Sequence, residues 1–564
     1  MITLLLLSSL WIFSLAGYGG MVLRALPVTL AGRSDENFSV RVVLGHIPVL
    51  AMGFALHLIA PLSGWYVAII PLLGIALFVR LAKPYFLRWW ILALASAICI
   101  FASRPIAHGD SGYYSIPVIS WIVEEPVVRG LANLDPTYGY NSSWWILSSL
   151  MAWPLGTGIG VIAVSVPFLV CAGGILLPAT LRAMRGQGRW VDWFLVPAFY
   201  LWLRQIVGVN TPSPSADIPA NLCTVLAFWA MIRALENRDS SGAEPGGKLQ
   251  KKIFPPAISG DGLLFMAFAV LAASAKLSAG LLLVVAAAWL GFSLLTDRGS
   301  VKTLWKNRAL VFLLGSLLSL QVVHSFLLSG YPLFPSGLGG WVDVPWRVDP
   351  DLPAATVARA REWAQTFGAT AEQVAAVPKW KLWIARQGSA TNLAMAGLAA
   401  LAGVAGTCLI ALRRGKSAAG SAILLVPASI AGILLVWNLV NAPALRFGAG
   451  YAFAVLGCLA AFVGPLLPGK VSRAAVILWI LTCVLSMSRL ATERTASWLY
   501  PPDLPTSTFQ AWKTNQGETI FIPDGGLAWI GPRPSAPPFE FNPCLQILRD
   551  PRSKKISELR RGQP

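Results

Sequence analysis

Residues 104 to 145 read RPIAHGDSGYYSIPVISWIVEEPVVRGLANLDPTYGYNSSWW, a stretch between two segments that are apolar enough to span a bilayer. Its first acid, Asp110, follows an apolar segment that ends near Ser103, and Gly109 and Gly112 leave the backbone free to turn sharply there. This places a carboxylate at the membrane surface, where an ionisable group is a functional candidate. An ordinary solvated loop is the alternative, but the density of aromatic and acidic residues favours chemistry.

The composition excludes a soluble globular protein. The chain has 564 residues, of which 56% are hydrophobic and only 12% charged, and this balance is typical of a polytopic membrane protein. The net charge of +19 comes from short Lys and Arg clusters between apolar segments, which indicates cytoplasmic loops and not nucleic-acid binding. The seven cysteines form no CxxC pair, so neither a disulfide framework nor a zinc site follows.

The apolar segments predict an all-α polytopic membrane protein with about fourteen transmembrane helices, outer-face loops that carry surface helices, and a small C-terminal unit. The first segment has no basic residue before it, so we expect an uncleaved span and not a signal peptide. The spans are expected near 2–22, 40–60, 64–81, 88–104, 157–181, 190–208, 218–235, 259–274, 278–296, before about 328, and near 391–411, 420–439, 449–467 and 473–489.

The basic clusters orient these spans and divide the chain into six segments. The N-terminus and the Asp110 loop face outward, and the charged linker at 236–258 faces the cytoplasm. Two helical pieces are expected in the second outer loop, around Pro353 to Phe367 and Ala371 to Arg386, and one strand, ETIFIP, in the tail. The segments are N-terminal transmembrane helices at 1–104, a first periplasmic loop with the candidate acid at 105–156, central transmembrane helices at 157–327, a second periplasmic loop at 328–390, C-terminal transmembrane helices at 391–489, and a small periplasmic tail at 490–564.

The outer side collects the polar residues that could do chemistry. A site with carboxylates and cations suits the transfer of a sugar from a phosphate, because cations stabilise the leaving phosphate while a carboxylate accepts the proton of the acceptor. Asp110 is the candidate catalytic residue. The candidates for substrate binding are His108, Tyr113, Asp217, Lys276, Tyr331 and Arg446.

Most of these residues have a plainer interpretation. Lys276 could reach from the bilayer to the interface, Arg446 could be an anchor, and Asp217 could cap the helix that follows it. Glu124 and Glu125 belong to an expected amphipathic surface helix, IPVISWIVEE, and are predicted to form its solvated face. His108 has no second histidine at ligand spacing, so we interpret it as a hydrogen-bonding neighbour of Asp110.

The order of the motifs HGDSGYY, YNSSWW, SPSAD, SGYPLFP and APALRF resembles the GT-C superfamily of membrane glycosyltransferases, and in particular a bacterial multi-span group related to protein O-mannosyltransferases and aminoarabinose transferases. The resemblance covers most of residues 40 to 490. It implies that Asp110 acts as catalytic base or metal partner and that Lys276, followed by Gly280, and Arg446 contact a lipid phosphate. Here about three additional spans precede the acidic loop, and Asp110 is followed by Ser111 where some families have a second acid.

We therefore predict a glycosyltransferase of the inverting type in the bacterial inner membrane, with its active site facing the periplasm. It would move a sugar from a polyprenyl phosphate to a lipid or polysaccharide acceptor, without a nucleic-acid partner. A transporter or flippase of lipid-linked glycans and a polysaccharide polymerase or ligase with a diphosphate donor are the alternatives. The sequence leaves open whether a divalent metal takes part.

Overall fold

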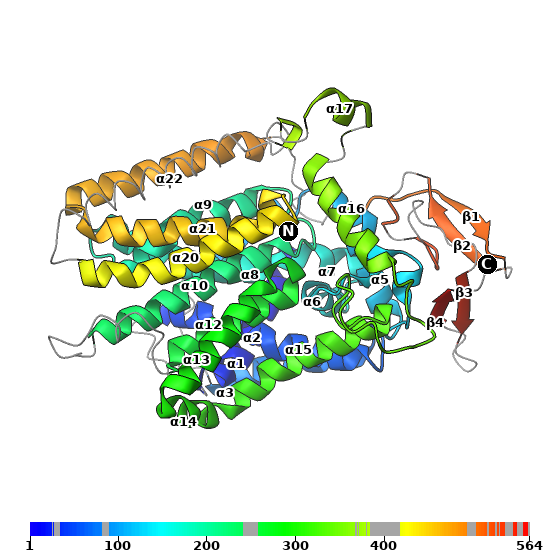
Figure 1. Ribbon diagram of the computed structural model, residues 1–564, viewed down its shortest axis with the longest axis horizontal. Helices are drawn as coiled ribbons and strands as arrows, with labels where there is room; N and C mark the ends of the chain where they lie inside the picture. The colour runs from blue at the N-terminus through cyan, green and yellow to red at the C-terminus, as the bar shows by residue number, and fades with distance from the viewer. Residues whose placement is uncertain are drawn as a thin grey trace.

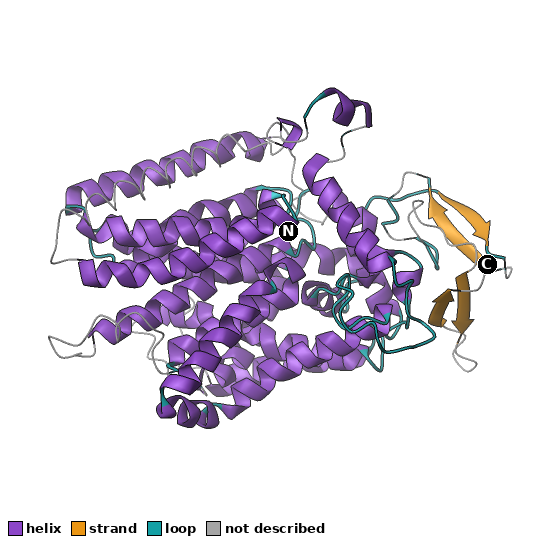
Figure 2. Cartoon of the chain, viewed as in Figure 1, coloured by secondary structure: helices purple, strands orange, loops and turns teal. Residues whose placement is uncertain are grey.

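The computed structural model describes residues 1–24, 26, 34–81, 89–240, 258–366, 369, 371–378, 381–383, 418–492, 503–515, 518–524, 527–529, 531–535, 545–549 and 556–561. The described chain is mainly helical. Figure 1 shows its long helices side by side, with two small β-hairpins at one end of the bundle and the short helix α14 at the lower edge of the view. In Figure 2 the strands are confined to that one end. The predicted span at 391–411 and residues 241–257 of the charged linker lie outside the described residues.

Nine helices of the described chain are long and apolar enough to cross a membrane, and three shorter apolar helices accompany them. The helical membrane fold is therefore confirmed, while the count of about fourteen spans stays a prediction. The elements are α1 (Ile2–Arg24), α2 (Ser34–His57), η1 (Trp65–Ala68), α3 (Ile69–Leu81), α4 (Trp89–Ala102), η2 (Ser111–Ser115), α5 (Ile116–Glu124), η3 (Leu131–Asn133), η4 (Pro136–Gly139), α6 (Ser143–Ala152), α7 (Thr157–Ala163), α8 (Ser165–Met184), α9 (Trp190–Val207), α10 (Asp217–Ser240), α12 (Gly260–Ala275), η5 (Leu277–Ala279), α13 (Leu281–Thr296), α14 (Arg298–Lys306), α15 (Arg308–Ser329), α16 (Leu352–Thr366), α17 (Ala371–Ala376), α20 (Ala418–Asn441), α21 (Leu445–Val463), η6 (Gly464–Leu466), α22 (Gly469–Thr492), β1 (Phe509–Lys513), β2 (Thr519–Pro523), β3 (Leu545–Arg549) and β4 (Ile556–Arg561).

Close backbone contact joins α1 to α2. A Cβ atom on Gly19 would lie 1.6 Å from the Arg41 carbonyl oxygen, and one on Gly45 would lie 1.9 Å from the Leu15 carbonyl oxygen. No side chain fits at either position. Small residues allow this approach between membrane helices, where packing and not the exclusion of water drives association.

Buried ion pairs join the helices at the end away from the hairpins. The Arg182 guanidinium bonds both Glu36 on α2 and Asp192 on α9. The Arg233 Nε atom lies 2.9 Å from the Asp261 carboxylate, which ties α10 to α12. Charges in a membrane bundle are costly unless they are paired. These pairs therefore fix how the helices are placed along one another, which helix propensity does not determine.

Two predicted surface helices differ from expectation. Helix α5 is buried from Ile116 to Val123, because α6 packs on it and the Arg533 guanidinium lies 4.8 Å from the Trp121 ring. The prediction of a surface helix at IPVISWIVEE is therefore wrong. The second helix of the outer loop, α17, ends at Ala376, shortly before Pro378, because a proline disfavours helical geometry in the residue before it. The first, α16, has the predicted extent.

The C-terminal residues form two antiparallel hairpins. Strand β1 pairs with β2, which covers the predicted ETIFIP strand except for its first residue, and β3 pairs with β4. The Leu559 amide donates a hydrogen bond of 2.8 Å to the Arg129 carbonyl, so the second hairpin also contacts the loop after α5. The described part of the tail thus lies against the first large loop.

Candidate active site

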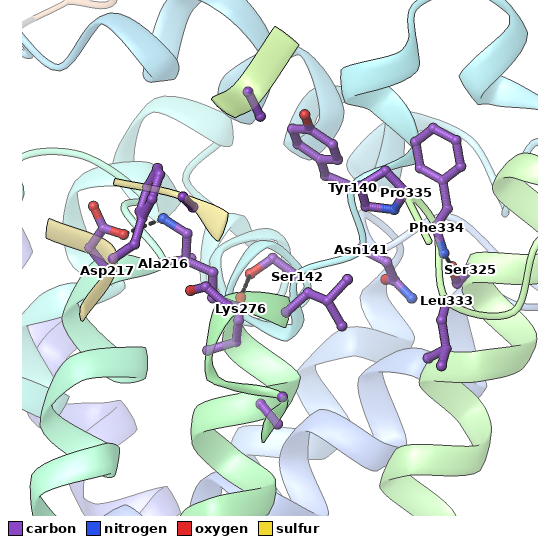
Figure 3. A pocket seen from close by; sticks show the side chains of 18 of the residues that line it. Tyr140, Asn141, Ser142, Ala216, Asp217, Lys276, Ser325, Leu333, Phe334 and Pro335 are labelled. Atoms are coloured by element: carbon purple, nitrogen blue, oxygen red, sulfur yellow. Dashed lines mark hydrogen bonds and ion pairs between the residues drawn. The ribbon is translucent and has the colours of Figure 1, made fainter. Parts of the chain in front are cut away.

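A cavity of about 470 Å³ opens where several membrane helices end. Its walls come from the Asp110 loop, the start of α10, the junction between α12 and α13, the C-terminal half of α15, α16 and the turn before α21. In Figure 3 the labelled lining residues Tyr140, Asp217 and Lys276 come from separate segments of the chain. This volume lies within the range of about 300–1,000 Å³ that is usual for small-molecule sites.

Four charged side chains form an alternating chain along the cavity wall. The Arg446 guanidinium donates a hydrogen bond of 2.9 Å to the Asp110 carboxylate, and its Nε atom lies 4.0 Å from the Asp217 carboxylate. Asp217 in turn pairs with the Lys276 ammonium, as the dashed line in Figure 3 shows. The Asp217 side chain is only 4% exposed, whereas those of Asp110, Lys276 and Arg446 are between 25% and 30% exposed. The last three therefore remain open to a ligand.

Local geometry places each of these charges. Asp217 is the first residue of α10, and Lys276 has extended backbone between α12 and η5, so neither side chain is enclosed within a continuous helix. Arg446 lies in the first turn of α21. The Asn221 side chain holds that turn, because its amide donates to the Arg446 carbonyl at 3.0 Å and accepts from the Gly450 amide at 2.8 Å. Helix α10 thereby sets the position of α21.

Asp110 precedes a segment of π-helix. The residues Ser111–Ser115 form η2, a rare geometry that is frequent at functional sites. Burial raises the pKa of the Asp110 carboxyl, but the Arg446 charge, with smaller contributions from Lys276 and the Tyr114 hydroxyl, outweighs the effect of burial and holds the pKa below its ordinary value. The carboxylate is therefore charged near neutral pH.

His108 lies beside the Asp110–Arg446 pair. Its Nδ1 atom is 4.0 Å from the Asp110 carboxylate and its Nε2 atom is 3.4 Å from an Arg446 nitrogen. Burial lowers the pKa of the imidazole more than Asp110 raises it, so the ring is neutral at pH 7. A neutral ring at this position helps to orient the pair without adding a charge.

Aromatic rings enclose the two central cations. The Phe447 ring centroid lies 4.1 Å from the Lys276 ammonium and 4.8 Å from the Arg446 guanidinium, and the Trp363 ring of α16 lies 4.8 Å from Arg446. Such contacts hold cations in place with little surrounding water. The rings of Tyr114, Tyr140 and Trp145, which also line the cavity, form edge contacts, with the Tyr114 centroid 5.6 Å from that of Tyr140 and 5.7 Å from that of Trp145.

A third cation, Arg361 on α16, also lines the cavity. Its guanidinium donates hydrogen bonds of 3.1 Å and 3.0 Å to the carbonyl and side-chain oxygens of Asn441, and within the described chain it has no carboxylate partner. Because Asp110 and Asp217 balance Lys276 and Arg446, the charge of Arg361 leaves the cavity with an excess of one positive charge.

The structure brings five of the seven predicted site residues together: His108, Asp110, Asp217, Lys276 and Arg446 line the cavity. Tyr331 is not among the residues that line the cavity. Its carbonyl accepts hydrogen bonds from two serine hydroxyls of α15, which turns the ring into a separate small core, and the residues just after it line the cavity instead. Tyr113 is not among the lining residues either, because neighbouring positions of a helical turn point in different directions and Tyr114 takes the inward one.

Sequence reasoning missed Arg361, Trp363, Tyr114 and Tyr140. The YNSSWW motif, which supplies Tyr140 and Trp145, is a usable signal because it places three polar residues between aromatic residues. Arg361 gave none, since it stands among other charged residues of a helix that looks like a solvated surface element. Glu124, which was expected on a solvated face, has a side chain that is 55% exposed and 2.8 Å from Arg533, away from the cavity lining.

Within the described ranges, no three side chains of the types His, Cys, Asp or Glu gather in a way that could hold a metal ion. Both carboxylates of the cavity already bind cations of the chain itself.

The fold and this cavity define a helical membrane protein with a charged site at one end of its bundle. Residues 1–453 match the family described as a domain of unknown function, DUF8201, and the chain belongs to that family. Comparisons with curated proteins and with solved structures give no match.

Proposed function

We propose that this protein is a glycosyltransferase that moves a sugar from a polyprenyl phosphate to a lipid or polysaccharide acceptor. The observation that supports it best is the meeting of Asp110, Lys276 and Arg446, which come from segments more than 150 residues apart, in one cavity at the ends of membrane helices. The site would face the periplasm from the bacterial inner membrane, as the Lys and Arg clusters and the resemblance to GT-C enzymes imply.

The charges fit the reaction. The bond between the sugar and the phosphate breaks, a bond forms between the sugar and the acceptor oxygen, and the acceptor proton moves to a carboxylate. The phosphate gains a negative charge as it leaves, so fixed cations lower the barrier. Arg361 has no carboxylate to neutralise it within the described chain and is the cation best able to attract the donor phosphate.

Donor binding would activate the base. In the free protein Asp110 is a weak base, because Arg446 lowers the pKa of its carboxyl. A phosphate that enters between Arg361 and Lys276 competes for Arg446 and shares its positive charge. The pKa of Asp110 then rises toward its ordinary value, so the carboxylate gains basicity only when the donor is in place.

The remaining walls suit a lipid-linked sugar. Leu283 of α13 and Leu318 and Val322 of α15 extend the lining along membrane helices, where an isoprenoid chain can lie. The edges and faces of Tyr114, Tyr140 and Trp145 offer a sugar ring both hydrogen bonds and apolar contact.

The test uses the purified full-length protein in nanodiscs with radiolabelled polyprenyl-phosphate hexoses. The readouts are donor binding and the release or transfer of the sugar, measured with and without a chelator. Conversion of the donor supports the proposal, and loss of conversion with the chelator adds a metal to it. Movement of intact labelled lipid across a vesicle membrane without conversion would instead indicate a flippase, and conversion of diphosphate donors alone would indicate a polymerase or ligase.

A further inference from the structure

The C-terminal unit, here the described residues from 503 to 561, lies against the segment that carries Asp110. The backbone amide of Trp529 donates a hydrogen bond of 3.0 Å to the carbonyl of Gly112, which is two residues after Asp110 and inside η2. The match to the family ends at residue 453, so this unit lies outside the matched residues.

The contact between Trp529 and Gly112 is close enough to exclude any side chain. A Cβ atom on Gly112 would lie 2.5 Å from the Trp529 ring, where real Cβ atoms essentially never lie. Trp529 is 8% exposed and has a φ of 41°, a strained value for a bulky residue. Strain of this kind persists only where the surrounding structure fixes it, and it is frequent at functional sites.

Further contacts fix the residues that follow Trp529 in the C-terminal unit. The Arg533 guanidinium lies 2.8 Å from the Glu124 carboxylate and donates a hydrogen bond of 2.6 Å to the Ser120 hydroxyl, both on α5. The Tyr138 hydroxyl donates a hydrogen bond of 3.2 Å to the Ser535 carbonyl. Trp529 is therefore held by a docked unit and is not the end of a loose chain.

We propose that Trp529 is a positioning residue for Asp110: its ring and its amide hold the π-helical segment η2, and so set where the carboxylate stands relative to Arg446. The inference rests on the proposed role of Asp110 as the catalytic base. A misplacement of a catalytic group by about 1 Å can lower the rate about a hundredfold. A contact that holds the backbone two residues from Asp110 should therefore affect kcat more than donor affinity.

The first test replaces Trp529 with Ala in the full-length protein and measures donor turnover, donor affinity and hydrogen exchange of residues 109–116. We expect kcat to fall about 10- to 100-fold while the donor affinity changes less than threefold, and the segment to exchange faster. The matched control is Trp512→Ala, since Trp512 lies on β1 of the same unit and is 49% exposed. If Trp529→Ala does not fold, Trp529→Phe, which keeps an aromatic ring of smaller size, takes its place.

The second test uses Gly112→Ala, whose added methyl group must push against the Trp529 ring. We expect it to lower kcat about tenfold or more, and the double variant Gly112→Ala with Trp529→Ala to recover part of that loss. Only direct contact between Gly112 and Trp529 predicts such a recovery, because the losses of kcat from two independent structural defects would add in the double variant.

The outcomes separate this inference from the proposed function. If the wild-type protein converts no donor, the glycosyltransferase proposal fails, and hydrogen exchange alone decides whether Trp529 holds the segment. If hydrogen exchange of residues 109–116 is unchanged in Trp529→Ala, Trp529 does not hold the segment η2, and the inference fails. Faster exchange with unchanged kcat, or equal losses of kcat and donor affinity, overturns the positioning role.

Discussion

Replacement of Asp110 with Asn tests the proposed chemistry most directly. Asn keeps the size of the side chain and can still accept the hydrogen bond of 2.9 Å from Arg446, but it has no charge and cannot take a proton. The change removes the base while it leaves the shape of the cavity nearly intact. We expect sugar transfer to fail although the donor still binds.

The magnitude has two parts. General-base assistance contributes about 100- to 10,000-fold to a rate, which corresponds to about 3 to 5 kcal/mol, and kcat should fall by that factor. Arg446, freed from its charged partner, should bind the donor phosphate better. A partly exposed ion pair is worth up to about 1 kcal/mol, so the donor affinity should stay the same or improve by up to about fivefold.

The assay measures single-turnover conversion and equilibrium binding of the same polyprenyl-phosphate sugar in nanodiscs. Asp343→Asn is the matched control, because Asp343 lies in the second outer loop with its side chain 91% exposed and should retain full activity. A kcat within tenfold of the wild type would remove Asp110 from the mechanism. A loss of donor affinity that equals the loss of turnover would make Asp110 a binding residue and not the base.

Four further predictions follow from the same geometry. Arg361→Gln should weaken donor binding about tenfold or more, while Arg359→Gln on the same helix, outside the cavity lining, should not; equal affinities would make Arg361 a structural contact. Lys276→Ala should lower the melting temperature, because it leaves the buried Asp217 carboxylate without the Lys276 ammonium, at a cost of about 3–5 kcal/mol in the free energy of unfolding. The double variant with Asp217→Asn should recover most of that stability, and thermal unfolding in detergent measures both variants. The pKa of the Asp110 carboxyl lies below its ordinary value of about 3.9, so the stability from its ion pair is present above that pH and is lost only as the pH falls through the lower folded-state value. The pH profile of kcat/KM, which reports the free protein, should therefore be flat from pH 7 to about pH 5. The profile of kcat, which reports the donor complex, should fall at a higher pH than that of kcat/KM, because the bound donor raises the pKa of Asp110. Reporter fusions in the charged linker after α10 should be cytoplasmic and fusions to the C-terminal unit periplasmic, and an exported signal from the linker would reverse the proposed orientation.

The stability prediction for Lys276 reverses what its sequence position suggests. A lysine at the end of an apolar segment is expected to reach into water and to add little to packing. In the structure the residue pairs with Asp217, whose side chain is only 4% exposed. Removing Lys276 therefore costs free energy of unfolding mainly because the buried Asp217 carboxylate loses its charged partner, and Asp217 is 59 positions away in the chain.

The sequence by itself determined that this is a helical membrane protein, because the hydropathy and length of a span depend only on residues that are adjacent in the chain. It also located Asp110, Asp217, Lys276 and Arg446, since ionisable residues at the ends of apolar segments are rare and costly. Alternation of the spans was enough to predict that these residues lie on one side of the membrane.

Only the tertiary structure decided which side chains meet. Whether Tyr113 or Tyr114 faces the cavity depends on the rotation of one helical turn, and η2 departs from regular α-helix there. Arg361 and Trp529 belong to segments whose sequences look like a solvated helix and a polar tail, and their roles arise from contacts with residues 80 and more than 400 positions away. Such contacts depend on how rigid elements pack in three dimensions, and no local pattern of hydropathy or charge encodes that packing.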